Sequence, residues 1–566
     1  MEHPRKHILV IIPARGGSKS IPRKNLLLIN NKPLLAFSIE AALQAKHELE
    51  QEAIAEVDVF VSSDDQAILE IGRLFGVNTL IRPAYLSEDH VPLDPVVCHA
   101  VHTVEGMRQV KFDTVVTLQP TSPLLRGATL VRAIRQFFVG EADTLISVSL
   151  ESHIYWQKAG DSLLPLCKER RNRQWLEPLY RETGGFVISR RHVLDEGKRF
   201  GVAVEIYPLD FPENIDVDNW HDLVLVEACL KRKRIAIRTD GDRNMGLGHV
   251  YRMLTLAKRL WNHEVMFFMD AQKPLGVKKV ESECLPVRTF TSDDELFDLL
   301  RKYAPDIVIN DILDTETTYI ATLKSLGCRV VNFEDLGQGA RLADIVINAL
   351  YEWSGLSTNQ YYGYKYECLR EDCYFVAPKQ GVSPNVKEMV ITFGGTDPGN
   401  TTAKVLKAIE KADLRDIRVK VVVGLGYAPI EQLLAYVQTL RAKGFEVEVL
   451  QDVQLMAPLL READLVICSN GRTVYEAVAV AVPTVTISQN VRETSHLFSR
   501  ISPGVINIGL SAEIGPEQIA STIAALVNDY EQRRRMHEEL RPIALDLRKG
   551  IERVLGLILE GVYVVK

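Results

Sequence analysis

The sequence predicts an α/β protein built on parallel sheets, and three observations support this fold class. Short apolar, β-branched runs alternate with segments whose apolar residues recur at the helical period, which is the pattern of parallel-sheet α/β domains. The chain has 566 residues, too many for one hydrophobic core and enough for about three or four lobes of ordinary size. Its composition, 46% hydrophobic and 25% charged, is that of an ordinary globular protein.

Residues 1–232 are predicted to hold the first sheet. Its strands are expected at residues 8–12, 58–62, 115–118 and 144–148, with helices between them at 34–45 and 67–75. An amphipathic helix at 220–231 ends in a basic run, residues 231–234. Such a run is more typical of a solvated helix end, which the helix dipole favours, than of a nucleic-acid-binding patch. Because a new strand begins at residue 234, we place a domain boundary near residue 232.

The remaining residues are predicted to form two more α/β lobes, 233–382 and 383–566. The first lobe is expected to contain strands at 234–238, 265–269, 307–310 and 329–333. It also contains a helix whose apolar positions, 250, 253, 254, 257 and 260, follow the helical period. The second lobe begins with a strand at 389–393, after a loop at 379–384. No short internal repeat is visible, so no solenoid is expected.

Charge and cysteine content exclude several classes of function. The formal net charge of −7 argues against a general nucleic-acid-binding protein, because such proteins need a basic face. The eight cysteines are scattered and include no C-x-x-C pair, which predicts reduced thiols rather than a zinc ribbon or a disulfide framework. No apolar stretch reaches the length of a membrane span or of a signal peptide core. We therefore expect a soluble, cytoplasmic protein that contacts neither nucleic acid nor membrane.

A glycine pair surrounded by cations follows the first predicted strand, where residues 11–25 read IIPARGGSKSIPRKN. Glycines let the backbone approach a ligand closely, and Arg15, Lys19 and Lys24 supply charge for a polyphosphate. The segment is neither a Walker loop nor a dinucleotide fingerprint. Its order and spacing resemble the opening signature of the CMP-N-acylneuraminate (nonulosonic acid) cytidylyltransferases, which activate nine-carbon sugar acids with CTP. The resemblance implies a Rossmann-like nucleotidyltransferase domain whose substrate-binding residues include Gly16, Gly17, Ser18, Lys19 and Asn25.

Further segments extend this resemblance. Asp64 follows the second strand, at the sheet edge where open α/β folds bind ligands. Residues 118–124, LQPTSPL, follow the third strand and offer polar side chains from Gln119, Thr121 and Ser122. In the family's sugar-acid region an arginine would meet a carboxylate and a tyrosine would pack on the sugar; the matching residues here are Arg173, Gln174 and Tyr180. Residues 182–186 depart from the family's asparagine-glycine pattern, which bears on the identity of the sugar acid.

Two aspartates before the helix at 220–231 suggest a metal site. If residues 214–219 form an extended strand, Asp216 and Asp218 face the same side while Ile215 and Val217 pack inward. Paired hard oxygen ligands suit Mg²⁺ bound to a triphosphate. The alternative is a helix N-terminus that carries acids because the dipole favours them. The resemblance implies in-line displacement at the α-phosphate of CTP, with Arg15, Lys24 and the two aspartates as the catalytic residues, and it implies a dimer formed through this domain.

A histidine marks the start of the helix that follows residue 246. Residues 246–254 read GLGHVYRML, and His249 would lie on the first helical turn, where the positive helix end favours a neutral imidazole able to act as a base. Taken alone, such a histidine more often caps or packs. A dehydrogenase is an alternative, because Asp270 ends the next strand where a ribose-binding acid would lie. Tyr251 replaces the third fingerprint glycine, however, so that interpretation is weak.

The wider pattern in this half resembles the UDP-sugar hydrolase of pseudaminic acid biosynthesis, which has a two-lobed fold like the GT-B glycosyltransferases. The matching segments are GHVYR at 248–252, GYKYECLR at 363–370, TFGGTDPGN at 392–400 and ADLVI at 463–467. The resemblance implies that His249 activates water, that glycine loops cradle the diphosphate, that Glu476 holds the ribose, and that no metal or other cofactor is needed. The substrate-binding residues implied are Gly248, Arg252, Gly394, Gly395, Asn400, Gly471, Thr473 and Glu476.

The combined hypothesis is a bifunctional enzyme of nonulosonic acid biosynthesis, acting on pseudaminic or legionaminic acid or a related sugar acid. Its partners would be CTP, the nonulosonic acid and a UDP-linked diacetamido-trideoxy sugar. Two alternatives stay open for the second half: a GT-B-type glycosyltransferase, or a non-catalytic module that binds a nucleotide sugar.

Overall fold

The computed structural model describes residues 5–167, 169–242, 246–351, 358–424 and 426–560. The chain divides into two compact units, Met1–Arg232 and Lys233–Lys566. Both are α/β, as the alternation of strand and helix patterns predicts. Within the described ranges, every helix is too short or too polar to cross a lipid bilayer.

The first unit is built on a seven-stranded sheet with the order β11-β7-β10-β6-β1-β4-β5. β10 runs antiparallel to both of its neighbours, and the other pairs are parallel. The strands are β1 (Lys6–Pro13), β4 (Ala55–Ser63), β5 (Asn78–Ile81), β6 (Thr114–Thr117), β7 (Thr144–Glu151), β10 (Leu179–Arg190) and β11 (Val204–Pro208). The helices are α1 (Leu34–Gln51), α2 (Gln66–Leu74), α3 (Leu93–Arg108), α4 (Gly127–Val139), α5 (Arg191–Asp195) and α6 (Trp220–Leu230).

Helices cover both faces of this sheet, which explains why β1 is apolar at consecutive positions. Ile8, Val10 and Ile12 pack with the core on one face. Leu9 and Ile11 point to the opposite face and pack with residues of α3. A parallel strand buried on both sides reads as a continuous apolar run, and its carboxyl end delivers the glycine loop to the sheet edge.

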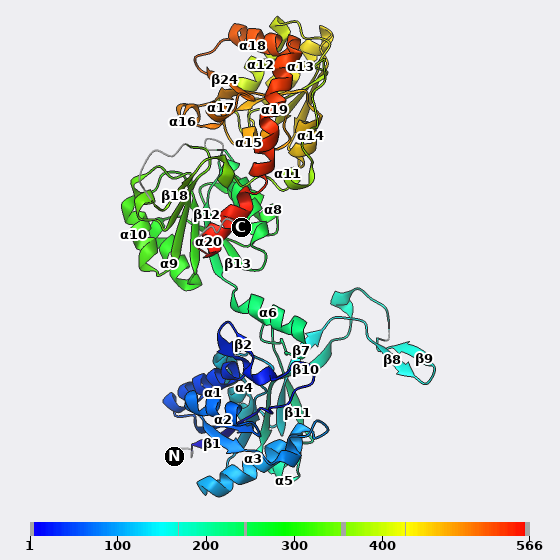
Figure 1. Ribbon diagram of the computed structural model, residues 1–566, viewed down its shortest axis with the longest axis vertical. Coiled ribbons are helices and arrows are strands. Elements are labelled where there is room, and N and C mark those ends of the chain that lie inside the picture. Colours follow the sequence, from blue (N-terminus) through cyan, green and yellow to red (C-terminus); the bar gives the residue numbers. More distant parts are fainter. Residues whose placement is uncertain (1–4, 168, 243–245, 352–357, 425, 561–566) are drawn as a thin grey trace. The chain divides into compact units, whose positions relative to one another are not determined.

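An arm leaves the sheet of the first unit between β7 and β10. Its hairpin, β8 (Trp156–Ala159) paired with β9 (Ser162–Pro165), projects from the body of the unit in Figure 1. The arm carries large apolar side chains in water: Trp156 is 55% exposed, Leu163 64% and Trp175 69%. Such a group is uncommon on an isolated soluble domain and is typical of a contact surface.

The second unit holds two all-parallel sheets, one in each of two lobes. The first lobe has the strand order β14-β13-β12-β15-β16-β17-β18, and the second has β21-β20-β19-β22-β23-β24. In both sheets the chain starts at a central strand, moves to one edge and then crosses to the other side, which is the doubly wound order of Rossmann folds. This agrees with the predicted two-lobed, GT-B-like α/β arrangement.

The first lobe contains β12 (Arg234–Thr239), β13 (Glu264–Asp270), β14 (Val287–Phe290), β15 (Ile307–Asp311), β16 (Arg329–Phe333), β17 (Ile345–Asn348) and β18 (Gln360–Tyr362). Its helices are α7 (Gly248–Arg259), α8 (Pro274–Ser282), α9 (Asp293–Tyr303), α10 (Thr317–Ser325) and α11 (Asp372–Phe375). The second lobe contains β19 (Glu388–Thr392), β20 (Arg418–Val423), β21 (Val447–Gln451), β22 (Leu465–Ser469), β23 (Thr484–Ser488) and β24 (Val505–Leu510). Its helices are α12 (Thr401–Lys411), α13 (Ile430–Ala442), α14 (Met456–Glu462), α15 (Thr473–Ala479), α16 (Val491–Thr494), α17 (Phe498–Ile501) and α18 (Pro516–Asn528).

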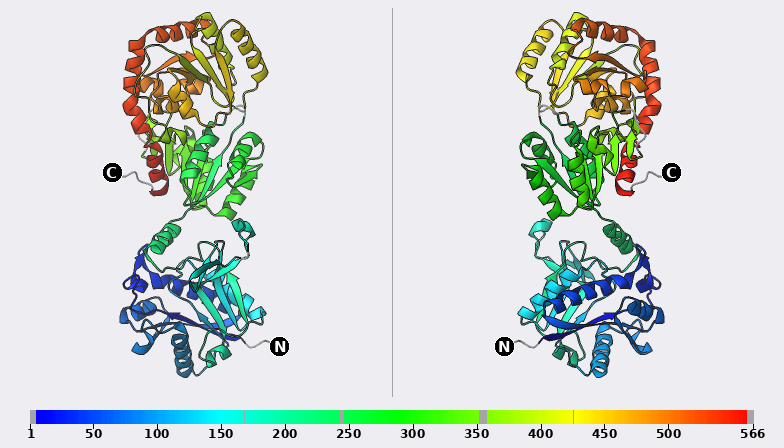
Figure 2. Two further views of the ribbon diagram at one scale, coloured as in Figure 1. Left: turned by 90° about the vertical axis from the view of Figure 1, so that its right-hand side faces the viewer. Right: turned by 90° about the vertical axis from the view of Figure 1, so that its left-hand side faces the viewer.

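Two C-terminal helices connect the lobes of the second unit. α19 (Tyr530–Leu547) contributes Leu540 and Ala544 to the core of the second lobe. α20 (Gly550–Glu560) then returns to the first lobe, where Val554 and Leu557 pack with residues of β12 and α7. Figure 2 shows these helices in red along the side of the unit. The chain therefore crosses between the lobes twice.

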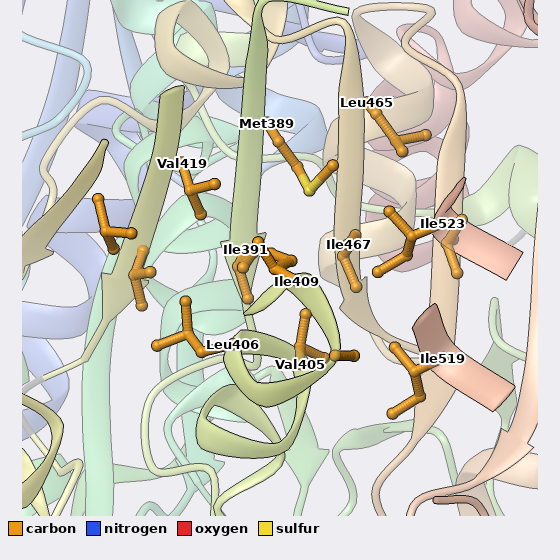
Figure 3. Packing of buried hydrophobic residues seen from close by; sticks show 14 of the residues in the cluster. Met389, Ile391, Val405, Leu406, Ile409, Val419, Leu465, Ile467, Ile519 and Ile523 are labelled. Atoms are coloured by element: carbon orange, nitrogen blue, oxygen red, sulfur yellow. The ribbon is translucent and has the colours of Figure 1, made fainter. Parts of the chain in front are cut away.

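The core of the second lobe shows how the sequence pattern builds a layer. Ile391 and Ile467 come from neighbouring strands, and Leu406 and Ile409 of α12 pack against them (Figure 3). Ile523 of α18 closes the same core. The strand residues alternate toward this face, whereas the helix residues recur at three- and four-residue intervals, so both periods bring apolar side chains to one layer.

Candidate active sites

The glycine loop of the first unit begins at the carboxyl end of β1. The Gly16 N–H donates to Asp64 Oδ1 at 3.1 Å, and the Asn25 side-chain amide donates to the Arg15 carbonyl at 2.9 Å. A Cβ at Gly16 would lie 2.8 Å from the Cβ of Asp65, so only glycine permits this approach. The loop thus crosses the sheet edge against the residues that follow β4.

Lys24 joins this loop to the acidic pair predicted to hold a metal. Its ammonium donates to the Val217 carbonyl at 2.7 Å and lies 4.0 Å from Asp218 Oδ1. Burial lowers the pKa of Lys24, although Asp218 and Asp216 act in the opposite direction. The loop and the acidic segment are therefore in contact, although about two hundred residues separate them in sequence.

Several buried polar atoms near this contact have no hydrogen-bond partner among the described residues. Thr121 Oγ1, Ser122 Oγ and Asp216 Oδ1 are buried and have no hydrogen-bond partner among the residues that the structure describes. Two of them flank Gly184, because a Cβ there would be 2.5 Å from Thr121 Oγ1 and 2.8 Å from Asp216 Oδ1. Buried polar groups are nearly always paired in proteins, so these atoms indicate the place of a ligand or water.

The acidic segment differs from its prediction in one respect. Residues 214–219 form no strand, because their backbone amides bond to a turn and to a loop: Ile215 N–H donates to the Pro212 carbonyl and Val217 N–H to the Thr121 carbonyl. Ile215 and Val217 are nevertheless buried, at 8% and 0% exposure, as predicted. The irregular backbone gives the same inward and outward alternation without a ladder partner.

The N-terminus of α6 is capped by Asn219 and Asp222, not by Asp216 or Asp218. Asn219 and Asp222 form a capping box at the start of α6, and the Asp218 N–H also donates to Asp222 at 2.8 Å. The carboxylates of Asp216 and Asp218 are not used as caps. Partial desolvation and the nearby charge of Asp216 raise the pKa of Asp218. Among the described residues, no group of three or more histidine, cysteine, aspartate or glutamate side chains is arranged to hold a metal ion.

The predicted sugar-acid residues lie in or beside the arm. Arg173 and Gln174 belong to a short 3₁₀ turn, Arg173–Trp175, and are exposed. Tyr180 pairs with Leu150 across β10 and β7 and is 46% exposed. No contact among the described residues joins Arg173 or Gln174 to Gly184, Thr121 or Asp216. Arg181 comes nearer: it binds Glu151 at 2.9 Å, and its charge acts on Asp218.

Two residues near the glycine loop are absent from the sequence-based prediction. Arg82 follows β5, is 4% exposed and donates to the Ser62 carbonyl at 2.7 Å. Burial lowers its pKa to about 10, and Asp64 and Arg15 lie within range of its charge. Asp89, in the next loop, binds both Arg15 and Lys19. The signal for Arg82 was its place just after a strand, at the ligand-binding edge of the sheet.

The second unit has a cavity of about 260 Å³ between its lobes. Leu247, Gly248 and Tyr251 line it from the first lobe, and the second lobe contributes the loops after β19, β22 and β23. Six of the eight predicted substrate-binding residues line this cavity: Gly248, Gly394, Gly395, Gly471, Thr473 and Glu476. Arg370 and Glu493 also line it and were not predicted.

His249 is held by a carboxylate at the end of β15. Its Nδ1 lies 2.6 Å from Asp311 Oδ1, and Asp311 is fully buried. Burial alone would raise the pKa of Asp311, but Arg252 and His249 lower it well below its usual range. The imidazole is 15% exposed, and Nε2 has no hydrogen-bond partner in the described part of the chain. Asp311 thus orients the ring and leaves Nε2 available to accept a proton.

Arg252 and Asn400 support the site from behind rather than lining the cavity. Arg252 is 2% exposed and donates to Asp311 at 2.8 and 2.6 Å and to Glu334 at 2.9 Å. Asn400 precedes α12 and accepts a hydrogen bond from the Tyr427 hydroxyl at 2.6 Å. Both contacts occupy the polar groups that the sequence-based prediction assigned to substrate.

Arginines of the second lobe bind across the cavity to the first. Arg472 donates to Glu367 at 2.9 Å, to the Cys368 carbonyl at 2.6 Å and to the Gly248 carbonyl at 2.7 Å. Gly248 immediately precedes His249, so Arg472 ties the loop after β22 to the helix that carries the histidine. Arg492 makes a second connection, with Asp314 at 3.1 Å.

Glu493 makes the stability of the second unit depend on pH. Burial raises its pKa from 4.5 to about 7. A carboxyl whose folded-state pKa is raised destabilises the fold when it ionises. This destabilisation is fully present above about pH 7 and disappears as the pH falls below about 5. In the structure the Gln489 N–H donates to Glu493 Oε2 at 2.8 Å. Glu493→Gln keeps an acceptor oxygen for this N–H but removes the charge. We expect the variant to be about 1–2 kcal/mol more stable than wild type at pH 8 and equal near pH 5, measured by urea unfolding. Equal effects at both pH values would contradict this.

Comparison with known proteins adds to the geometry of the first unit. A family model described as Cytidylyltransferase matches residues 9–162. The pseudaminic acid cytidylyltransferase of Campylobacter jejuni is 30% identical over 233 residues, which are 39% of this chain and 96% of that protein. This chain belongs to the cytidylyltransferase family. An uncharacterized protein of Methanocaldococcus jannaschii is 31% identical over 273 residues, 45% of this chain, and the match spans only 56% of that relative's length.

Other matches extend beyond the cytidylyltransferase region. The spore coat polysaccharide biosynthesis protein SpsG of Bacillus subtilis is 25% identical over 342 residues, 58% of this chain and 98% of that protein. That length exceeds the first unit, which ends at Arg232. Among solved structures, MurG of Acinetobacter baumannii matches with a TM-score of 0.43 and 17% identity, covering 58% of this chain and 99% of its own.

Proposed function

We propose that the first unit of this cytidylyltransferase-family chain transfers a cytidylyl group from CTP to a nonulosonic acid. The anomeric hydroxyl oxygen attacks the α-phosphorus, the bond to the β-phosphate oxygen breaks, pyrophosphate leaves and the hydroxyl proton passes to solvent. The observation that carries this proposal is the pair of buried, unpartnered oxygens beside Gly184, Thr121 Oγ1 and Asp216 Oδ1, next to the segment that Lys24 contacts. Such a site stabilises the transfer mainly through positioning and charge.

Each group has a role that follows from its place. The backbone of Gly16 and Gly17 and the side chains of Arg15, Lys19 and Lys24 would bind the phosphates. The hydroxyls of Thr121 and Ser122, unpartnered in the pocket, would bind the nucleotide or the sugar acid. Because Lys24 contacts the segment that carries Asp218, binding of the phosphates there also places them next to the acidic pair.

Asp216 and Asp218 are the residues that would hold Mg²⁺. The fit rests on two observations. Asp216 Oδ1 is buried without a partner, and partial desolvation together with the charge of Asp216 raises the pKa of the neighbouring Asp218. Two adjacent carboxylates are stabilised when a cation lies between them. When bound, Mg²⁺ neutralises charge on the phosphates. The chain's own residues orient the triphosphate beside the acidic pair and Lys24.

The name of the Campylobacter relative favours pseudaminic acid as the sugar acid, and legionaminic acid is the next candidate. The deciding experiment incubates the protein with CTP, Mg²⁺ and, separately, pseudaminic, legionaminic and N-acetylneuraminic acids. Mass spectrometry should detect one CMP-sugar together with stoichiometric pyrophosphate. No CMP-sugar with any of the three acids would contradict the proposal.

A glycine-to-alanine exchange tests the pocket directly. Gly184→Ala would place a methyl group 2.5 Å from Thr121 Oγ1 and 2.8 Å from Asp216 Oδ1. Because a displacement of about 1 Å at a reacting centre lowers rates by about 10²-fold, we expect at least that loss of CMP-sugar formation. The control is Gly106→Ala in α3, where a methyl group meets nothing within 4 Å and activity should be unchanged. Wild-type activity in Gly184→Ala would place the reaction elsewhere.

The exposed arm supports the further proposal of a dimer through the first unit. Its apolar side chains, including Trp156, Leu163 and Trp175, are more than half exposed, and a second copy of the chain would remove them from water. Light scattering of the full chain should give twice the monomer mass. Changing Leu163 and Trp175 together to serine should lower it to the monomer mass; a monomeric wild type would contradict this.

For the second unit we propose hydrolysis of a UDP-linked sugar to UDP and the free sugar. His249 Nε2 would take a proton from water, whose oxygen attacks the anomeric carbon as the bond to the diphosphate breaks. The supporting observation is the pairing of His249 with the buried Asp311 beside a cavity that two lobes enclose. UDP release from UDP-sugars should occur without an acceptor. Release that requires an added sugar acceptor would favour the glycosyltransferase alternative, and binding without release the non-catalytic one.

A further inference from the structure

The cations of the glycine loop already have an anionic partner within the chain. Arg15 Nη1 lies 2.7 Å from Asp89 Oδ1, and Lys19 Nζ lies 2.8 Å from Asp89 Oδ2. Each carboxylate oxygen therefore holds one cation, much as two non-bridging oxygens of a phosphate would. The hydrogen bond from Lys19, with the charges of Lys19 and Arg15, lowers the pKa of Asp89, so it carries its charge at neutral pH.

Asp89 differs from the other acids beside the loop. Asp65 caps α2, accepting from the Ala67 N–H at 2.8 Å, and Asp64 accepts from the Gly16 N–H at 3.1 Å. Asp89 lies in the exposed turn between a 3₁₀ turn, Ala84–Leu86, and α3. Within the described residues its carboxylate contacts only Arg15 and Lys19. It supports no helix end or strand, so its described contacts serve the loop's cations alone.

We propose that Asp89 is an internal competitor for the phosphate site and lowers the affinity of the first unit for polyphosphate ligands. The inference rests on the proposed cytidylyl transfer, because it assumes that Arg15 and Lys19 bind phosphates. A triphosphate or pyrophosphate carries several negative charges and gains more from the two cations than Asp89 loses. A ligand with a single phosphate group, such as CMP, gains no more from the two cations than Asp89 would lose, so it leaves the carboxylate in place.

This competition affects both ends of the reaction. CTP enters by displacing Asp89 from Arg15 and Lys19. When pyrophosphate leaves, Asp89 can bind the two cations again, which weakens rebinding of pyrophosphate. The cost is a weaker affinity for CTP than the same loop would have without the carboxylate.

The test compares ligand affinities of the full chain and of Asp89→Asn, which has nearly the same shape without the charge. Isothermal titration with Mg²⁺ measures the Kd of CTP, inorganic pyrophosphate and CMP. Exposed ion pairs are individually weak, so we expect the Kd of CTP and pyrophosphate to fall about threefold to tenfold, with less than a twofold change for CMP. Glu88→Gln is the matched control, because Glu88 is 59% exposed and lies near His90 only among the described charges; all three affinities should stay at the wild-type values.

Unchanged or weaker pyrophosphate binding by Asp89→Asn would overturn the inference, as would an equal gain for CMP. Asp89→Ala should repeat the direction of Asp89→Asn, and opposite effects of the two variants would also overturn it. The proposed function is tested separately by CMP-sugar formation in the wild type. If the wild type makes CMP-sugar but Asp89→Asn binds pyrophosphate no better, only this inference is wrong. If the wild type makes no CMP-sugar but Asp89→Asn binds pyrophosphate more tightly, the proposed reaction is wrong and Asp89 still competes with anions for Arg15 and Lys19.

Discussion

Asp216→Asn should lower CMP-sugar formation by about 10²–10³-fold while leaving the fold intact. The carboxylate lies beside the unpartnered hydroxyl of Thr121, and its charge acts on Lys24, so under the proposed function it would help hold Mg²⁺. Loss of one charged ligand removes several kcal/mol of charge stabilisation from the transfer step. Because Asp216 Oδ1 has no described hydrogen-bond partner, the amide should fit without a loss of stability.

The measurement is the rate of pyrophosphate release from CTP at increasing Mg²⁺, with thermal unfolding as the check on folding. Asp210→Asn is a matched control, since Asp210 is an exposed acid in the same segment, and it should keep the wild-type rate. Asp218→Asn should show a loss similar to that of Asp216→Asn. If either Asp216→Asn or Asp218→Asn keeps more than a tenth of the wild-type rate, the metal assignment is wrong.

The parts of the fold that the sequence predicted are those with a strong local pattern. β1 is apolar at every position from Ile8 to Ile12 because both of its faces are buried, and α7 repeats apolar residues at the helical period through Val250, Met253 and Leu254. Because consecutive parallel strands end at one sheet edge, the glycine loop, Asp64 and Gln119 were also expected there together. These features depend on residues close in sequence or on a general rule of sheet topology.

The parts that the sequence did not predict depend on distant contacts. Asp311 lies one residue beyond the predicted strand at 307–310, and its partner His249 lies 62 residues earlier, so no local pattern joins them. Asp222 caps α6, whereas Asp216 and Asp218 do not, and nothing in the sequence distinguishes the three acids. The arm between β7 and β10 was also missed, because its short strands and exposed apolar residues follow neither period clearly.

In the second unit, Asp311→Asn should lower UDP release from a UDP-sugar by about 10³–10⁴-fold. Asp311 accepts from Arg252 at 2.8 and 2.6 Å and binds His249 Nδ1 at 2.6 Å. An asparagine cannot favour the imidazole tautomer that leaves Nε2 free to take a proton, and in a histidine-aspartate pair this loss alone is worth about 10⁴-fold. The change also leaves the buried Arg252 with less countercharge, so unfolding should become easier by about 3–5 kcal/mol.

His249→Ala separates catalysis from stability in the same network. Asp311 keeps both of its hydrogen bonds from Arg252 in this variant, so we expect a small change in unfolding free energy and a loss of UDP release as large as that of Asp311→Asn. Added imidazole should restore part of the rate in His249→Ala, because a free base can replace the missing one. It should not restore the rate in Asp311→Asn, because the His249 side chain still fills the site. The first unit supplies an internal control, since CMP-sugar formation should stay at the wild-type rate in His249→Ala. UDP release that survives in His249→Ala without imidazole would mean that another group activates the water, and the pairing with Asp311 would then serve only the fold.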